Sequence, residues 1–403
     1  MDISDLDWLS GEGAPVLERW TLDAPEDPLE AVTLLRRELG RERAALVLEQ
    51  VGLRRRAVRK FGRDALGMLF TKKLLEQASG PEVADFKARR LAALGTRSVA
   101  DLCCGAGGDA LALARTGFLV HLVDRDPLAL ALSAHNLGKS GFREASRTET
   151  TLPDLGDLVA DVFHLDPDRR AKGSSEDGEE RWDNRGLSPD PDGIRQITAR
   201  FRGGAVKLPT GAPAGFLDIE GELQFLGVAD ELREQVLWTK DAGISGRLSV
   251  AELRRGAWEE YSGTQADAQD AFGEEPAEQP GLWIHEPVKA MVRSHLFAAF
   301  GRDRGLNLLD ASTSWLTGGP CPSRLLKSYR VLAHGPLRAG AEEAILREAG
   351  RSCGAVKKRG VAVVPEKALR DLRGLPGDPA ILCYLRSCGR KWVVVAEASG
   401  DEN

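Results

Sequence analysis

Residues 98–126 constrain the fold of this chain more than any other segment. They read as an apolar strand (SVADLCC), a turn with Gly105, Gly107 and Gly108, a helix (ALALA) and a second apolar strand (FLVHLVD) that ends at Asp124. The glycines let the backbone turn closely against a ligand because they lack a Cβ atom. A carboxylate at a strand end can accept hydrogen bonds from both hydroxyls of a ribose. Open α/β sheets bind ligands at the edge formed by the carboxyl ends of their strands. The segment therefore predicts a βαβ unit that binds a nucleotide.

Two classes of ligand fit this turn, and the residue before the glycines separates them. Read as GxGxxA, Gly105, Gly107 and Ala110 match a loose dinucleotide fingerprint, with Asp124 at about the 20-residue spacing that fingerprint expects. Asp101, however, precedes the turn at the end of the first strand, where a carboxylate would repel a pyrophosphate. The sulfonium and ammonium groups of S-adenosylmethionine (SAM) complement that acid. We therefore expect SAM as the cofactor, bound by Asp101, Gly105, Gly107, Gly108, Asp109, Asp124 and Arg125; a purely structural corner is the alternative.

These residues also resemble a known family. DLCCGAGGDALALA and VDRDPLALALSAHNLGKSGF are similar to segments of class I SAM-dependent methyltransferases, in particular the branch related to trimethylguanosine synthase, in which a Cys-Gly-x-Gly-Gly turn and a later His-Asn pair are characteristic. His135 and Asn136 match that pair. MLFTKKLLEQASGPEVADFKARR and AVKKRGVAVVPE resemble a bacterial group that carries a THUMP-like C-terminal domain. The resemblance covers most of the chain and implies a Rossmann-like α/β class I methyltransferase domain, SAM as cofactor and RNA as partner.

The organisation of the chain follows from shifts in its composition. A length of 403 residues suggests two or three domains. The first 88 residues have helical apolar spacing and no β-branched runs, which predicts a helical domain. Strand-like and helix-like segments then alternate through the catalytic domain, and a Gln, Glu, Ala, Gly and Pro-rich stretch reads as a linker. We expect a helical domain over 1–88, a methyltransferase domain over 89–261, a linker over 262–280 and an α+β, THUMP-like domain over 281–403.

The end of the fourth expected strand reads HLDPDRR, with Asp166, Pro167 and Asp168 as the candidate catalytic residues. Enzymes of this class that methylate exocyclic amines carry Asn or Asp, two prolines and an aromatic there: the oxygen orients the amine and the aromatic stacks on the base. Here the second proline and the aromatic are missing, although Arg169 could stack through its guanidinium plane and Trp182 could return from the following loop. The alternative is that Asp166 caps the next element and that Arg169 and Arg170 pair with the acidic SSEDGEE loop.

Covalent methylation of a pyrimidine carbon is excluded by the cysteines. That reaction needs attack by a cysteine, and the sequence has none between Cys104 and Cys321. Direct transfer to a nitrogen or oxygen remains, with Asp166 as the group that orients the nucleophile and without a metal.

Basic residues gather in two places despite a net charge of −6. From Val51 to Lys73 eight cations face one acid, and Lys357, Lys358 and Arg359 form a second run between apolar strands. A solvated helix face and a charge-protected sheet edge are the alternatives to contacts with an RNA backbone. The residues assigned to substrate or RNA are Arg55, Arg59, Arg63, Arg169, Arg170, Lys207, Lys357, Lys358 and Arg359.

We expect the protein to be cytoplasmic. Its N-terminus is acidic and lacks a signal-peptide core, and no apolar run reaches membrane-spanning length, so we expect no membrane partner. The six cysteines form neither a disulfide framework nor a zinc pattern, and buried reduced thiols are expected. The oligomeric state is not predicted.

Three functions remain open from the sequence. The first is a methyltransferase that acts on a nitrogen of a base in RNA. The second is a methyltransferase for a small molecule or a protein, which the acidic net charge and the absent aromatic favour. The third is a non-catalytic module that binds SAM and RNA.

Overall fold

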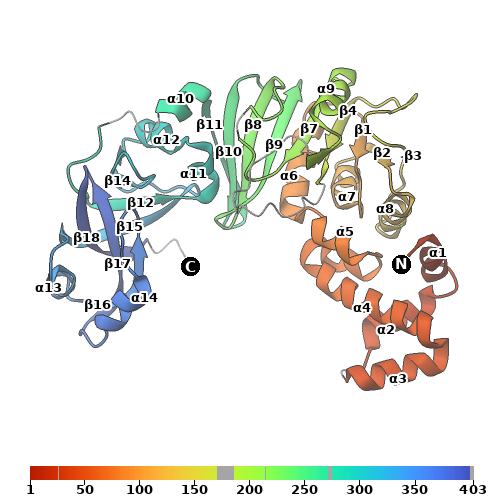
Figure 1. Cartoon of the computed structure of the whole chain (residues 1–403), viewed down its shortest axis with the longest axis horizontal. Coiled ribbons are helices and arrows are strands. Elements are labelled where there is room, and N and C mark those ends of the chain that lie inside the picture. The colour runs from red at the N-terminus through yellow and green to blue at the C-terminus, as the bar shows by residue number, and fades with distance from the viewer. Residues whose placement is uncertain (26, 170–185, 214, 271–274, 400–403) are drawn as a thin grey trace. The chain divides into compact units, whose positions relative to one another are not determined.

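The computed structural model describes residues 1–25, 27–169, 186–213, 215–270 and 275–399, with Arg169 described by its backbone alone (Figure 1). Contacts divide the chain into two compact units. Unit 1 comprises Met1–Glu222 and Gln235–Ser245, and unit 2 comprises Leu223–Glu234 and Gly246–Asn403. The domain boundaries expected at 88, 261 and 280 stay predictions.

Unit 1 begins with a bundle of helices, as the apolar spacing predicts. Asp2 caps the first helix through a capping box with Asp5, and Asp27 followed by Pro28 starts the third. Leu6, Leu17 and Leu35 face a shared core against Val47 of the long fourth helix. The elements are α1 Ile3–Ser10, α2 Ala14–Asp23, α3 Pro28–Leu39, α4 Arg41–Phe61, η1 Gly62–Leu66, α5 Lys72–Gln77 and α6 Pro81–Ala92.

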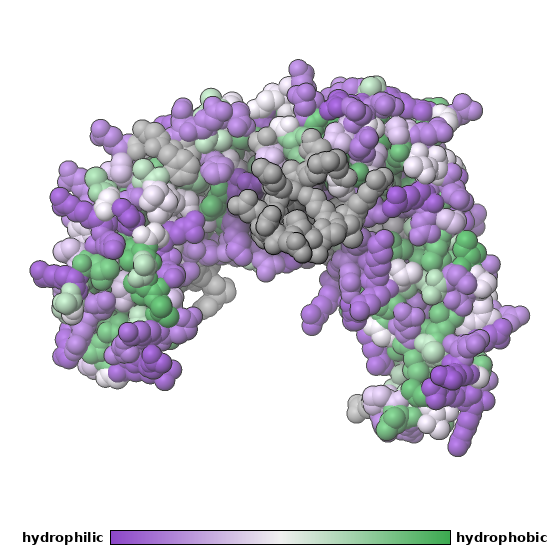
Figure 2. All heavy atoms as spheres, in the orientation of Figure 1, coloured by the Kyte–Doolittle hydropathy of each residue, from purple (hydrophilic) through white to green (hydrophobic). Residues whose placement is uncertain are grey.

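The surface of this bundle also carries apolar side chains. Leu22 and Leu29 are 72% and 77% exposed, and Figure 2 shows hydrophobic patches between hydrophilic ones over the region of α1–α4. Single exposed apolar residues are common on folded proteins, so these positions need no partner to explain them.

The expected α/β sheet forms the rest of unit 1. Within it, the strand order is β9-β7-β4-β1-β2-β3. All neighbours from β7 to β3 are parallel, and β9 pairs with β7 antiparallel. The strands are β1 Ser98–Leu102, β2 Leu119–Asp124, β3 Ser146–Glu149, β4 Val162–Leu165, β7 Gly203–Leu208 and β9 Glu231–Lys240.

Helices connect these parallel strands: α7 Gly108–Arg115, α8 Pro127–Lys139 and α9 Pro191–Arg200. Both β1 and β4 are buried along nearly their whole length, as a parallel sheet covered on both faces requires. A short ribbon of β5 Asp168–Arg169 and β6 Leu187–Ser188 follows β4. A Cβ atom at Gly204 would lie 2.3 Å from the Phe163 ring, so this glycine lets β7 approach β4. The topology brings the carboxyl ends of β1, β2 and β4 to one edge of the sheet.

Unit 2 is an α+β structure, as expected for the C-terminal region. Its main sheet has the order β13-β14-β12-β15-β18-β17-β16, and β8, β10 and β11 form further strands. Ile284, Tyr329, Leu385 and Val394 fill a core on this sheet. The strands are β8 Gly221–Val228, β10 Arg247–Arg254, β11 Ala257–Thr264, β12 Trp283–Pro287, β13 Asn307–Leu308, β14 Leu316–Gly318, β15 Leu326–Pro336, β16 Arg351–Lys358, β17 Asp378–Ser387 and β18 Arg390–Ala398.

The helices of unit 2 are α10 Gln265–Gln269, α11 Lys289–Ser294, α12 Phe297–Asp303, α13 Ala341–Glu348 and α14 Pro365–Asp371. The stretch expected to be a linker begins with ordered structure: β11 runs to Thr264, and Thr264 and Asp267 form a capping box that starts α10. Among the described residues, no helix is both long and apolar enough to cross a membrane.

Candidate functional site

A cavity of about 440 Å³ lies at the carboxyl edge of the sheet in unit 1. Its walls come from the turn after β1, the ends of β2, β4 and β7, the residues after β3, and α5. This volume is in the range of pockets that enclose a small organic cofactor. The predicted residues Asp101, Gly105, Gly108, Asp109, Asp124 and Arg125 all line it.

The turn between β1 and α7 depends on unusual backbone angles. Cys103, Gly105 and Gly107 have φ values of 61°, 54° and 82°. A Cβ atom at Gly107 would lie 2.6 Å from Ser133 Oγ of α8, so this glycine serves the packing of α8 as well as the turn. Gly105 and Gly108 line the cavity, whereas Gly107, which the sequence assigned to the cofactor, faces the neighbouring helix.

Asp124 holds the end of β2 against this turn. Its Oδ2 accepts the Gly105 N–H at 3.1 Å and its Oδ1 accepts the Asp126 N–H at 3.0 Å. Burial raises the pKa of Asp124, although these N–H donors oppose the rise. Each carboxylate oxygen can accept further hydrogen bonds, so Asp124 remains able to bind hydroxyls in the cavity.

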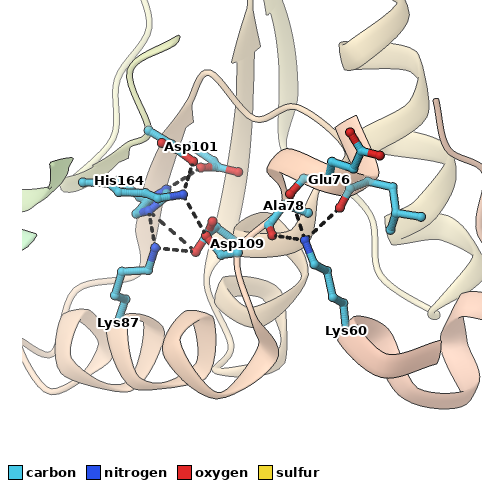
Figure 3. A network of polar contacts seen from close by, with 11 residues as sticks. Lys60, Glu76, Ala78, Lys87, Asp101, Asp109 and His164 are labelled. Carbon is cyan, nitrogen blue, oxygen red and sulfur yellow. Dashed lines mark hydrogen bonds and ion pairs between the residues drawn. The ribbon is translucent and has the colours of Figure 1, made fainter. Parts of the chain in front are cut away.

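Three buried side chains and one partly buried side chain, all charged or polar, form a network beside the turn (Figure 3). His164 of β4 lies between Asp101 of β1, with 2.8 Å from Nδ1 to Oδ1, and Lys87 of α6, with 3.1 Å from Nε2 to Nζ. Lys87 also pairs with Asp109 of α7, 2.8 Å from Nζ to Oδ1. The side chains of Asp101, Lys87 and His164 are each at most 2% exposed. Charges so deeply buried are tolerated only as a hydrogen-bonded set.

The pKa values of the two acids, Asp101 and Asp109, shift in opposite directions. Burial raises the pKa of Asp101 despite its hydrogen bond from His164. Burial also acts to raise the pKa of Asp109, but Lys87, His164 and Lys207 outweigh it and lower that pKa. Burial acts to lower the pKa of His164, and Asp109 and Asp101 outweigh it and raise that pKa.

Two ion pairs occupy the side of the cavity where β4 and β7 end. Asp166 directly follows β4, and its Oδ2 lies 2.7 Å from Lys207 Nζ. Arg125 donates to Asp168 Oδ2 at 2.7 Å. The structure thus brings Lys207, which the sequence placed on a separate segment, to Asp166, Pro167 and Asp168, and all four residues line the cavity. Arg170 and Trp182 lie outside the described residues.

The helical bundle supplies one wall of the cavity. Lys73, Leu74, Gln77, Ala78 and Ser79, in and after α5, all line it. Lys60 at the end of α4 fixes this segment, because its ammonium donates to the carbonyls of Leu75, Glu76 and Ala78 at 2.7 to 3.1 Å. These bonds satisfy carbonyls that the end of a helix leaves without partners.

Asn136, from the His-Asn pair singled out in the sequence, joins the bundle to the turn after β1. Asn136 accepts the Leu69 N–H and donates to the carbonyls of Leu69 and Ala106 at 2.8 to 3.0 Å. Burial lowers the pKa of His135 to about 4. Asn136 therefore has a structural role here.

The predicted basic runs divide into exposed and internally bonded residues. Arg55, Arg59 and Arg63 are exposed on α4 and η1. Arg54, from the same run, is buried and donates to the Met68 and Gly67 carbonyls, and burial lowers its pKa to about 10. In unit 2, Lys357 pairs with Glu286, Lys358 donates to the Val363 carbonyl and Arg359 to Ser314 Oγ.

Sequence reasoning missed Lys87, His164 and the α5 wall. Two weak signals were present. His164 interrupts a fully apolar strand, and Lys87 lies on the helix face that Val83, Ala84 and Leu91 bury. A polar side chain at either position needs a buried partner, but the sequence does not name it.

The polar atoms and the space in the cavity fit SAM. Asp101 Oδ2 is buried and has no hydrogen-bond partner among the described residues, which suits a cationic ligand. Asp124 offers acceptors suited to ribose hydroxyls, and Gly105 and Gly108 leave room beside the turn. Asp101, Asp124 and the glycine turn would hold the cofactor. The fold and site thus define a nucleotide-cofactor enzyme built on an open α/β sheet.

Comparisons with known proteins identify that cofactor. The chain is 33% identical over 349 residues to an uncharacterized SAM-dependent methyltransferase of Mycobacterium tuberculosis strain H37Rv, a match that covers 82% of this chain and 90% of the relative. The corresponding protein of strain CDC 1551 matches to the same extent. The chain belongs to this family of SAM-dependent methyltransferases.

Two further comparisons concern the fold and the helical bundle. A provisionally assigned methyltransferase of Porphyromonas gingivalis W83 has a crystal structure that matches with a TM-score of 0.77 and 16% identity, over 96% of this chain and 99% of that one. This likeness confirms the fold. Residues 2–57 match a family described as a domain of unknown function, DUF8688.

Proposed function

We propose that this methyltransferase transfers the methyl group of SAM to a nitrogen of a base in RNA. The observation that carries the proposal is the position of Asp166 and Pro167. Both line the cavity that also holds Asp101, Asp124 and the glycine turn, and Asp166 follows β4. A base nitrogen that enters there would meet an acceptor next to the cofactor site.

The chain's own residues would orient and desolvate the nucleophile. Asp166 accepts an N–H of the base, and the backbone carbonyl of Pro167 is a second possible acceptor; together they aim the nitrogen lone pair into the cavity. SAM supplies an electrophilic methyl group. A nitrogen–carbon bond forms as the sulfur–carbon bond breaks, and the nitrogen releases its proton to Asp166 or to water.

The choice of RNA rests on charge and on the resemblance to RNA methyltransferases. Lys73 is exposed at the cavity, and Arg55, Arg59 and Arg63 lie exposed on the same helical bundle. Cations in this arrangement suit a polyphosphate backbone that reaches the cavity. We also propose that unit 2 is THUMP-like and contributes to RNA binding.

A direct assay tests the proposal. The purified full chain is incubated with total RNA and methyl-labelled SAM, and the digested nucleosides are analysed by mass spectrometry. We expect label in one N-methylated nucleoside with the wild type and about a hundredfold slower labelling with Asp166→Ala. Label only in small molecules or protein would contradict the proposal.

One observation favours the second candidate, a methyltransferase for a small molecule or protein. Lys357, Lys358 and Arg359 are all bonded within unit 2, so this run offers RNA fewer free cations than its sequence suggests. The same assay with cell extract depleted of RNA separates the two candidates.

A further inference from the structure

The buried network of Lys87, Asp109, His164 and Asp101 is more elaborate than a binding turn requires. Many nucleotide sites need one carboxylate at the strand end, whereas here four ionisable side chains from β1, β4, α6 and α7 meet under the cavity. Lys207 of β7 is a fifth charge that acts on Asp109. Burying this many charges costs free energy, and apolar side chains of similar volume would often stabilise the fold equally well. A purely structural role therefore does not account for the network.

Hydrogen-bond chemistry assigns the protons within the network. A lysine ammonium has only donors, so the Lys87 contact requires His164 Nε2 as an acceptor. The ring proton then lies on Nδ1 and is donated to Asp101 Oδ1. With His164 neutral and both carboxylates ionised, the four groups sum to a charge of −1.

Protonation of His164 changes that sum without breaking its bond to Asp101. Nδ1 donates to Asp101 in both protonation states, while the added proton on Nε2 would face Asp109, 3.6 Å away, and repel Lys87. The network then becomes neutral. A cationic ligand at Asp101 Oδ2, which lacks a partner among the described residues, then meets one more positive charge nearby than it does in the neutral-ring state.

We propose that Lys87 and His164 are positioning residues that orient Asp101 toward the cationic part of SAM, and that protonation of His164 opposes cofactor binding. Linkage requires the effect to be reciprocal: bound SAM expels a proton from His164 to the same degree that this proton weakens SAM binding. Burial acts to lower the pKa of His164, but Asp109 and Asp101 raise it above its ordinary value, so the ring can take up this proton inside the protein.

Calorimetry of SAM binding to the full chain between pH 6 and pH 8 tests the proposal. We expect affinity to fall about tenfold as the pH falls through the pKa of His164, the change that a coupling of one pKa unit gives. His164→Asn retains a donor for Asp101 but cannot titrate, so its affinity should lose this pH dependence. The titration of SAM's own ammonium is common to both proteins and cancels in the comparison.

Matched variants separate positioning from general stability. Lys87→Arg keeps donors at this place and should retain most SAM affinity, whereas Lys87→Met should lose about tenfold. His121→Asn is the control, because His121 of β2 bonds Ser146 and does not line the cavity. If His164→Asn and the wild type show the same pH profile, the proposal is overturned.

A measurement on the wild type alone guards against variants that fail to fold. Binding heats in two buffers of different ionisation enthalpy count the protons released when SAM binds. Release that rises and falls around the pKa of His164, together with a lower pKa of one histidine NMR signal in the SAM complex, supports the proposal. No release between pH 6 and pH 8 and unchanged histidine signals would refute it.

Discussion

Lys207 Nζ lies 2.7 Å from Asp166 Oδ2, so a lysine near the end of β7 and the carboxylate that follows β4 form an ion pair inside the cofactor cavity. The lysine also lies 3.4 Å from Ser79 Oγ, at the end of the α5 wall. This arrangement gives Lys207 a partner within the protein, and the substrate or RNA contact assigned to it from the sequence stays a prediction. It also fixes which way Asp166 points.

Replacement of Asp166 should affect methyl transfer more than cofactor binding. We expect Asp166→Ala to bind SAM nearly normally and to lose about a hundredfold in methylation rate, because an orienting or proton-accepting group is removed. Asp166→Asn should keep part of the activity if the side chain only orients the amine. Rates and SAM affinities are measured side by side, with exposed Asp157→Ala as the control. Full activity in Asp166→Ala would contradict this role, and Asp168 would become the candidate catalytic residue.

Replacement of Asp124 should weaken the binding of SAM. The variant Asp124→Ala loses acceptors for the ribose and the bond that holds Gly105, and charge-assisted hydrogen bonds contribute roughly 1.5 to 3 kcal/mol. We therefore expect at least a tenfold weaker affinity by calorimetry. Asp124→Asn retains one acceptor, so its affinity for SAM should lie between those of the wild type and Asp124→Ala. Tight NAD binding without SAM binding would contradict this assignment of the site.

The exposed arginines of the helical bundle should determine how RNA binding depends on salt. We expect Arg55→Glu, Arg59→Glu and Arg63→Glu combined to weaken RNA binding and to flatten its salt dependence by up to roughly one unit of slope for each phosphate that the protein no longer neutralises. A variant with Arg36, Arg37 and Arg41 changed to Glu alters charge equally on exposed positions of α3 and α4 and serves as the control. Equal slopes in all three proteins would assign Arg55, Arg59 and Arg63 to a solvated helix face.

The stability of unit 2 should decrease as the pH rises from about 4.5 to 7. Burial raises the pKa of Glu252 to about 7 from 4.5, although the Asp230 N–H, Arg254 and Lys327 oppose the rise. The folded state thus binds this proton more tightly than the unfolded state, so its contribution is full below pH 4.5 and is lost as the pH reaches 7. The loss is about 3 kcal/mol at 1.36 kcal/mol per pKa unit. Denaturant unfolding at pH 5 and pH 8 should show a smaller difference for Glu252→Gln than for the wild type, and an equal difference would contradict the assignment.

Local sequence patterns predicted the elements of unit 1 better than their mutual contacts. The alternation of apolar strands and glycines located β1, α7 and β2, and it placed Asp124 and Asp166 at strand ends, because these features depend on neighbours along the chain. Lys87 and His164 escaped notice because their partners are long-range: 77 residues separate them, and tertiary packing alone brings them together. Likewise, Arg54 belongs to a basic run by sequence but is buried by the fold of the loop at Met68.

The bonds of Lys60 and Asn136 have a consequence for how this protein could be dissected. A fragment that begins after α6 would keep the sheet and the glycine turn, yet it would lack the α5 wall, the carbonyl anchors of Lys60 and the backbone partner of Asn136 at Leu69. The helical bundle, which includes the region matched by the family of unknown function, is therefore a component of the cofactor pocket and no removable appendage. Cofactor binding should in turn protect these helices from proteolysis, so that a digest of the N-terminal region reports on occupancy of the sheet's edge.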